Sequence, residues 1–234
     1  MRDTALPRAA AFGALALWAL AFWAAAAGAA GAQESAPLLR AEFRVQLDAI
    51  ESAEGPETAG LEKGSRYLVD EAAWAFSGMV WGFGFEYEPY DKVRGIAERF
   101  ALSPLGAIEP GDRRLTFLEP RGVGNELRAY VEYRPDAAGA AFLDSYGREP
   151  WASAQGTGSA DMKPGWLARR TACEDALRAA VREHLRLIEH NKPRGASGRV
   201  VFERPPRIVV REGRYVAQVR ARVEVTELAP YVVY

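Results

Sequence analysis

Cysteine and histidine are scarce in this sequence, and their scarcity excludes several classes of protein. The 234 residues include one cysteine and two histidines. The single thiol, Cys173, cannot form a disulfide within the chain, which excludes a small secreted scaffold held together by disulfide bonds. His184 and His190 are six residues apart, which is not the i, i+4 spacing of a zinc-binding helix. We therefore expect no metal site and no other cofactor.

A strong net charge is also missing. Lysine and arginine number 30 and aspartate and glutamate 31, which leaves a formal net charge of −1. Proteins that bind nucleic acid or anionic membranes through electrostatics carry a clear basic excess. We expect no nucleic-acid partner and no electrostatic attraction to a membrane.

Charged residues are absent from the stretch 9–32, which is rich in alanine, leucine, phenylalanine and tryptophan. Arg2 and Arg8 precede it, and it ends in the small residues 30–32. A basic start, an apolar middle and a small-residue exit predict a signal peptide over residues 1–32 and a periplasmic protein. The alternative is an inner-membrane anchor over residues 9–32, since a spanning helix needs about 20 apolar residues. Membrane contact is expected only through this segment, if it stays uncleaved.

The rest of the chain predicts two α+β modules, at residues 33–135 and 164–234, joined by a linker at 136–163. In the first module we expect a strand at 41–47, a loop at 51–60, a helix at 65–77 capped by Ser65, a strand at 81–87, a short helix at 91–102 capped by Asp91, and a hairpin of strands 115–118 and 127–133. In the second we expect a helix that begins at Pro164, with Trp166, Cys173, Leu177, Val181 and Ile188 on one face, and strands at 199–203, 208–210 and 215–225. Within the linker, residues 141–143 predict a short helix, and Gln155–Ser159 is a loop or a weak edge strand.

The two modules show a similar order of helix, strand and hairpin. The sequence 85–89 (FEYEP) resembles 202–205 (FERP), and 114–117 (RLTF) is placed against 207–210 (RIVV). This order predicts an internal duplication in which the segment 91–102 is an insertion. The alternative is that any two units of helix and hairpin look alike. The predicted fold class is α+β, with antiparallel sheet and two main helices packed on one face.

The alanine-rich segment 168–181 (ARRTACEDALRAAV), followed by a hairpin, resembles the modules of LPP20-like lipoproteins and FlgT-type flagellar-assembly proteins. The resemblance covers roughly the last 70 residues. It implies a structural or assembly role in the cell envelope and provides no active-site residues. The chain departs from this type because it lacks the lipoprotein cysteine. The chain as a whole resembles uncharacterised exported bacterial proteins.

Residues that could support catalysis are better explained as structure. Cys173 lies on an apolar helix face, where a buried thiol acts as a small hydrophobic side chain. Glu86 and Glu88 share one face of a strand, and such carboxylates usually face solvent. A hydrolase would have to use Glu86, Glu88 or Asp91. We expect that the protein is not an enzyme and that it has no catalytic residues.

Aromatic residues form the most distinctive cluster. A ligand or partner surface would comprise Trp74, Trp81, Phe83, Phe85 and Tyr87. The alternative is a core, because a sheet face that a helix covers needs large side chains.

These observations together predict a non-enzymatic protein of the periplasm or cell envelope. Its expected partner is an envelope protein or a cell-wall component. The alternative function is binding of an apolar small molecule through the aromatic strand Trp81–Tyr87.

Overall fold

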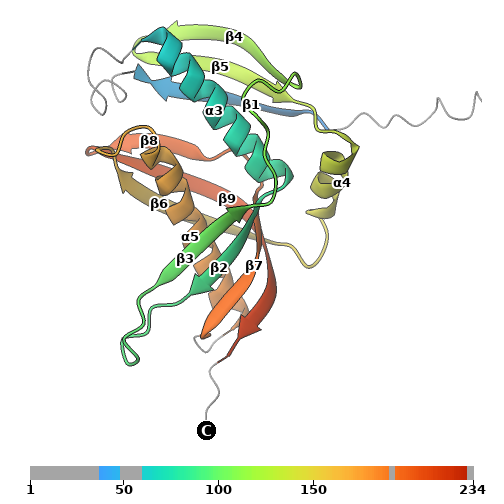
Figure 1. Ribbon diagram of the computed structural model, residues 1–234, viewed down its shortest axis with the longest axis vertical. Helices are drawn as coiled ribbons and strands as arrows, with labels where there is room; N and C mark the ends of the chain where they lie inside the picture. The colour runs from blue at the N-terminus through green and yellow to red at the C-terminus, as the bar shows by residue number, and fades with distance from the viewer. Residues whose placement is uncertain (1–36, 48–59, 190–192, 231–234) are drawn as a thin grey trace, which may run out of the picture. The chain divides into compact units, whose positions relative to one another are not determined.

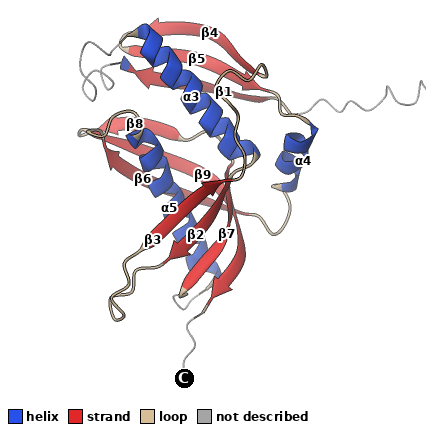
Figure 2. Ribbon diagram, viewed as in Figure 1, coloured by secondary structure: helices blue, strands red, loops and turns tan. Residues whose placement is uncertain are grey.

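The computed structural model describes residues 37–47, 60–189 and 193–230. Residues 37–234 form one compact unit, and its described part contains three helices and nine strands in two antiparallel sheets (Figures 1 and 2). This arrangement confirms the predicted α+β class. The expected signal segment, nearly all of the loop at 51–60 and His190 lie outside the described residues. None of the described helices has the length and apolar character to cross a membrane.

The smaller sheet, sheet A, has three strands in the order β1-β5-β4 and is covered on one face by helix α3. Along β5, side chains alternate between buried and half-buried, as the predicted period of two requires. Phe43 of β1 contacts Phe76 of α3 edge to face, with ring centroids 5.4 Å apart. The elements are β1 (Leu39–Gln46), α3 (Leu61–Val80), β4 (Leu115–Val123) and β5 (Glu126–Tyr133).

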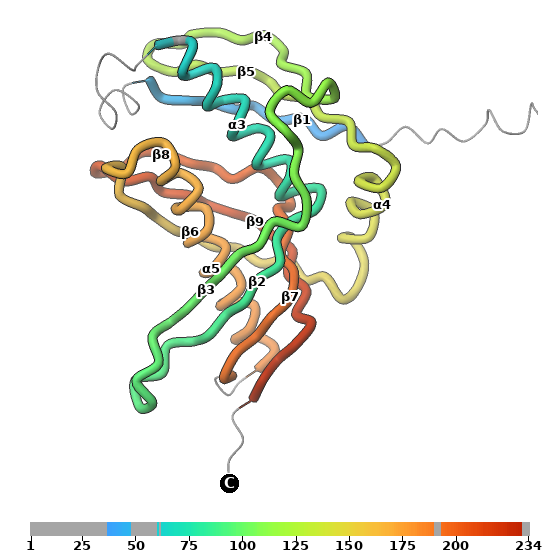
Figure 3. The backbone as a smooth tube through the Cα atoms, in the orientation of Figure 1, coloured from blue at the N-terminus to red at the C-terminus, as the bar shows by residue number. Residues whose placement is uncertain are grey.

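The larger sheet, sheet B, has the order β3-β2-β7-β9-β6, and β8 pairs with the free half of β9. Helix α5 packs against β6 and β9. Strands β2 and β7 come from opposite halves of the chain yet lie side by side (Figure 3). The elements are β2 (Phe83–Glu88), β3 (Arg99–Pro104), β6 (Ala152–Asp161), α5 (Ala168–Ile188), β7 (Gly195–Phe202), β8 (Arg207–Arg211) and β9 (Arg214–Ala229).

Helix α5 approaches β6 closely because both surfaces are made of small residues. A Cβ atom added to Gly156 would lie 2.0 Å from the carbonyl oxygen of Ala176, and one added to Gly158 would lie 2.2 Å from the backbone nitrogen of the same residue. Ala172, Ala176 and Ala180 are fully buried on the facing side of the helix. Their spacing of four residues forms one stripe along the helix, so helix backbone meets strand backbone without intervening side chains.

The two halves share an order of elements. In sheet A the strand before the helix, β1, pairs with the last strand, β5, which also pairs with its hairpin partner β4. In sheet B the strand before the helix, β6, pairs with the last strand, β9, which also pairs with its hairpin partner β8. The predicted duplication requires such a shared order and stays a prediction; the additional element of the first half is β3, which overlaps the end of the predicted insertion 91–102.

Three local predictions in the first half are wrong. Helix α3 begins at Leu61 after Gly60, so Ser65 lies inside the helix and does not cap it. Trp81 is the C-cap of this helix, and the strand begins only at Phe83. Residues 99–104 form a strand where a helix was expected, because Phe100 packs across the sheet against Phe85 and Tyr87. The spacing of apolar residues in this segment suits a helix and a strand equally, and the packing of the half-buried Phe100 on β2 decides for the strand.

The segment 136–163, predicted as a linker, contains regular structure. Asp136 caps helix α4 (Ala137–Ser145) by accepting the backbone N–H of Gly139 at 2.9 Å. Strand β6 then pairs with β9 along its whole length as an edge strand of sheet B. The division into two modules at this segment stays a prediction.

Helix α5 begins at Ala168, later than predicted from Pro164. Ile188, expected on the buried face, is 49% exposed at the last turn. The buried face ends at Leu185, since Leu187 is exposed as well.

Candidate functional site

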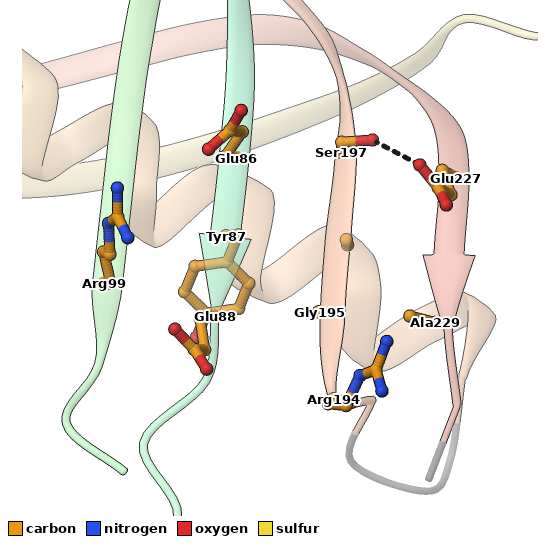
Figure 4. A pocket seen from close by; sticks show the side chains of 10 residues that line it. Glu86, Tyr87, Glu88, Arg99, Arg194, Gly195, Ser197, Glu227 and Ala229 are labelled. Atoms are coloured by element: carbon orange, nitrogen blue, oxygen red, sulfur yellow. Dashed lines mark hydrogen bonds between the residues drawn. The ribbon is translucent and has the colours of Figure 1, made fainter. Parts of the chain in front are cut away.

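A polar groove of about 390 Å³ crosses the end of sheet B and is the candidate functional site. It lies on the face opposite α5 and is lined by side chains from four strands and by Arg194, which precedes β7 (Figure 4). The charged and hydroxyl-bearing residues in its lining are Glu86 and Glu88 of β2, Arg99 of β3, Arg194, Ser197 of β7 and Glu227 of β9.

The alternation of β2 separates its aromatic side chains from its carboxylates. Phe83, Phe85 and Tyr87 are at most 6% exposed and face the core, while Glu86 and Glu88 point into the groove (Figure 4). Successive side chains of a strand point to opposite faces of the sheet. The sequence therefore predicts correctly that the carboxylates share a face, and the structure shows that this face lines the groove.

A β-bulge directs Glu227 into the groove. The register between β7 and β9 shifts between Ser197 and Gly198, so that Thr226 is the extra residue. The Thr226 hydroxyl donates to the carbonyl oxygen of Ser197 at 3.2 Å. A bulge of one residue exchanges the two faces of the strand that follows, and Glu227 thus lies on the same face as Ser197, whose hydroxyl is 3.5 Å from its Oε2 atom.

Gly198 makes this bulge possible. A Cβ atom there would lie 2.0 Å from the carbonyl oxygen of Glu224 and 2.9 Å from the ring of Phe85. Only glycine allows such a close approach of two backbones. A backbone requirement at Gly198 thus contributes to the direction in which Glu227 points.

The charges of the groove do not neutralise one another. The register places Glu88 directly opposite Arg99, and opposite charges in that position commonly pair. Within residues 37–47, 60–189 and 193–230, however, Glu86, Glu88, Arg99 and Arg194 form no ion pair and no side-chain hydrogen bond. The groove therefore offers two guanidinium groups and the carboxylates of β2 and β9 to a ligand that carries both signs of charge.

The opposite side of β2 carries a second polar cluster. The Tyr87 hydroxyl donates to Glu98 Oε1 at 2.8 Å, and Arg178 and Arg182 of α5 lie 3.6 and 3.8 Å from the same carboxylate. Burial and the bond to Glu98 raise the pKa of the Tyr87 phenol above its ordinary value. This cluster is an internal network that joins α5 to the hairpin of β2 and β3.

The structure does not bring the five aromatic residues of the predicted ligand surface together on one open face. Trp74 and Trp81 are half-buried and belong to α3 and its C-cap. Trp74 and Phe83 both contact Phe202, and Tyr87 contacts Phe100. Phe83, Phe85 and Tyr87 therefore belong to the core.

The remaining candidates for chemistry lie outside the groove. Cys173 is fully buried, and burial raises the pKa of its thiol well above the ordinary value. Asp91 is buried in a turn, where it accepts the backbone N–H of Val93 at 2.9 Å and pairs with Arg94. His184 is buried on α5, and burial lowers its pKa. Among the described residues, no group of three or more histidine, cysteine or acidic side chains is arranged to hold a metal ion.

Sequence reasoning missed four members of the groove. The predicted helix over 91–102 includes Arg99, and local sequence patterns indicate no role for Arg194, Ser197 and Glu227. The one local signal was Gly198, because an isolated glycine in a strand pattern is typical of a bulge. The pairing of β2 with β7 has no local signal.

The fold and the groove together define an α+β protein with a polar groove on one face of an antiparallel sheet. A protein-family model matches residues 27–231, and the chain belongs to this family, which is uncharacterised. The chain is similar to an uncharacterized protein of Treponema pallidum (strain Nichols), with 28% identity over 184 residues that cover 79% of this chain and 76% of the relative. No solved structure matches the chain. These findings give no support to the resemblance to LPP20-like and FlgT-type modules.

Proposed function

We propose that this protein is an exported, non-enzymatic binding protein of the cell envelope. In this proposal the groove holds a polar segment of mixed charge that belongs to an envelope protein or a cell-wall peptide. The observation that carries the proposal is a set of four charged side chains that form no ion pair with one another among the described residues: Glu86 and Glu88 of β2, Arg99 of β3, and Arg194 directly before β7.

Charge complementarity gives such a groove selectivity. A ligand with one sign of charge would meet repulsion from half of the lining, whereas a segment of mixed charge can satisfy both halves. The paired strands fix the backbone positions of Glu86, Glu88 and Arg99 before binding, so the backbone loses little entropy on association.

The proposed absence of catalysis follows from the chemistry of the lining. Ser197 lies next to the carboxylate of Glu227, whereas a serine nucleophile is commonly activated by an adjacent imidazole or amine base. The envelope location is supported by the signal pattern of residues 1–32. The resemblance of α5 and its hairpin to LPP20-like and FlgT-type modules would agree with an assembly role and stays a prediction.

Site-specific photo-crosslinking of the full-length chain tests the proposal. A photoreactive residue is placed at Ser197 in the groove and, as a control, at Glu212 in the exposed hairpin turn between β8 and β9. We expect an adduct with an envelope component at Ser197 and none at Glu212. Charge reversal of Glu86 and Glu227 to lysine should abolish the adduct. Equal adducts at both positions, or an adduct that survives charge reversal, would contradict the proposal.

The alternative, binding of an apolar small molecule through Trp81–Tyr87, has less support because Phe83 and Phe85 are packed against their own chain. Its test is tryptophan fluorescence during titration with lipids and small apolar ligands. A saturable shift that Phe83→Ala removes would favour this alternative over the groove.

A further inference from the structure

A second cavity, of about 220 Å³, lies between the edge strand β1 and the segment that leads into the edge strand β8. We propose that this cavity is a binding site for a phosphate group. Its lining comes from both halves of the chain and includes residues 41–44 of β1 and residues 204–208. This site is separate from the groove and does not depend on the function proposed above.

Uncompensated positive charge is the first reason. Arg44, Arg204 and Arg207 line the cavity, and none of them forms an ion pair or a side-chain hydrogen bond in the part of the chain that the structure describes. The lining also contains two carboxylates, but each already has a partner. Glu42 pairs with Arg121 at 3.3 Å and Glu71 with Arg169 at 2.7 Å. Three guanidinium groups are therefore left for an anion.

The strand register adds a second reason. Arg44 stands directly opposite Arg128 in β5, and like charges in that position are unfavourable. Arg128 pairs with Glu126 on its own strand, where the Nε atom of Arg128 donates to Oε2 of Glu126 at 2.8 Å. Arg44 is thus left without a carboxylate on its own sheet, and a bound anion would relieve the repulsion.

The backbone around the cavity is restricted. Arg204 and Arg207 flank Pro205 and Pro206, whose rings hold φ near −65°. A backbone that is restricted before binding loses less conformational entropy when the ligand binds. Arg169 forms part of the cavity wall and is 5% exposed. Its guanidinium group forms an ion pair with Glu71. Arg204, which precedes the two prolines, and Arg207, the first residue of β8, therefore lie at the two ends of a restricted segment next to this wall.

The side chains and the volume select the class of ligand. A guanidinium group can donate two parallel hydrogen bonds to the oxygens of one phosphate, and it stays positively charged at every physiological pH. The cavity has room for about seven water molecules at roughly 30 Å³ each, which suits a phosphate with a small attached group. The phosphate could belong to a free ester or to a lipid headgroup.

Titration with inorganic phosphate tests the site, with sodium chloride at equal ionic strength as the reference. The readout is the NMR resonance of each arginine Nε–H group in the full-length protein, assigned through the variants R44Q, R204Q and R207Q. We expect saturable shifts at these three arginines. R204Q and R207Q should each weaken binding about tenfold, because a charged hydrogen bond is lost.

Arg211 provides the matched control, since it is exposed on the same strand and does not line the cavity. R211Q should bind phosphate as the wild type does, and thermal unfolding should show that all variants are folded. Shifts that sodium chloride reproduces, or equal weakening by R211Q and R207Q, would overturn the proposal.

Two further titrations distinguish the sources of the phosphate. Glycerol phosphate in solution represents a free ester, and phosphatidic acid in phosphatidylcholine vesicles represents a headgroup. The ligand of this cavity is the one of the two whose binding is weakened by R207Q and left unchanged by R211Q. If R207Q weakens neither, the site is not a phosphate site.

Discussion

Glu71 of α3 and Arg169 of α5 form a bidentate ion pair across 98 positions of the sequence. Arg169 donates from Nε to Oε2 and from Nη2 to Oε1, each at 2.7 Å. Its guanidinium carbon lies 4.4 Å from the ring centroid of Trp166 and 5.4 Å from that of Tyr215. Burial by itself lowers the pKa of Arg169, but the carboxylate of Glu71 more than offsets this and holds the pKa above its ordinary value. The pair joins the main helices of the two halves.

Removal of one partner should destabilise the protein strongly. Glu71→Ala leaves a buried guanidinium without its carboxylate, and we expect a loss of about 3–5 kcal/mol. The double change Glu71→Leu with Arg169→Met removes both charges and should cost much less. Urea unfolding followed by circular dichroism measures both. A loss below about 1 kcal/mol for Glu71→Ala, typical of a surface ion pair, would show that the pair is not buried in solution.

Gly156 is predicted to accept no side chain. Gly156→Ala places a Cβ atom 2.0 Å from the carbonyl oxygen of Ala176, and relief of the clash requires α5 to move away from β6. We expect a loss of about 1–3 kcal/mol or more. The control is Gly122→Ala in β4, where a Cβ atom meets nothing within 4 Å. Thermal unfolding compares the two, and equal effects would count against the close packing of α5 on β6.

Cys173 should be unreactive while the protein is folded. Burial is the main reason that its thiol pKa exceeds the ordinary value of 9.0, and the Glu71 carboxylate adds to it. A thiol reagent at pH 8 should modify the protein only after urea unfolds it. Because the folded pKa is the higher one, the contribution of this group to stability is complete below pH 9 and is lost as the pH rises further. Cys173→Ala should reduce this loss, and rapid labelling of the folded protein would contradict the assignment.

His184 should make the protein less stable in mild acid. Burial lowers the pKa of this imidazole below its ordinary value of 6.5, so the unfolded chain takes up a proton before the folded chain does. Stability should therefore fall as the pH drops below about 6.5, until the folded pKa is reached. His184→Gln should flatten this part of the profile of unfolding free energy against pH. An unchanged slope between about pH 7 and pH 5 would show that His184 does not titrate differently in the two states.

Local patterns predicted the strands that have one buried face. In β9, alternation from Tyr215 to Val223 matches the observed burial residue by residue. The hairpin turn before it was also predicted, and Glu212 and Gly213 both have positive φ. Alternation failed near Phe100, because that segment suits a helix or a strand equally well and its sheet partner decides between them.

The candidate groove was predictable only in part. Glu86 and Glu88 were placed on one strand face from their spacing. Arg99 and Glu227 join them through the pairing of β2 with β3 and through the bulge in β9. The strand pairing and the bulge do not depend on the residues next to Arg99 and Glu227 in the sequence. Periodicity therefore could not predict that these two side chains line the groove.

The sequence by itself determined the composition of the two halves, the alternation of the strands and the apolar face of α5, because these depend on residues a few positions apart. Only the tertiary structure decided which strands pair, and hence that Glu86 meets Ser197 and that Glu71 meets Arg169. Those contacts follow from the burial of apolar surface over the whole chain, and many strand orders would satisfy the same local pattern. The packing of α5 on Gly156 and Gly158 and the pairing of β2 with β7 select one of them.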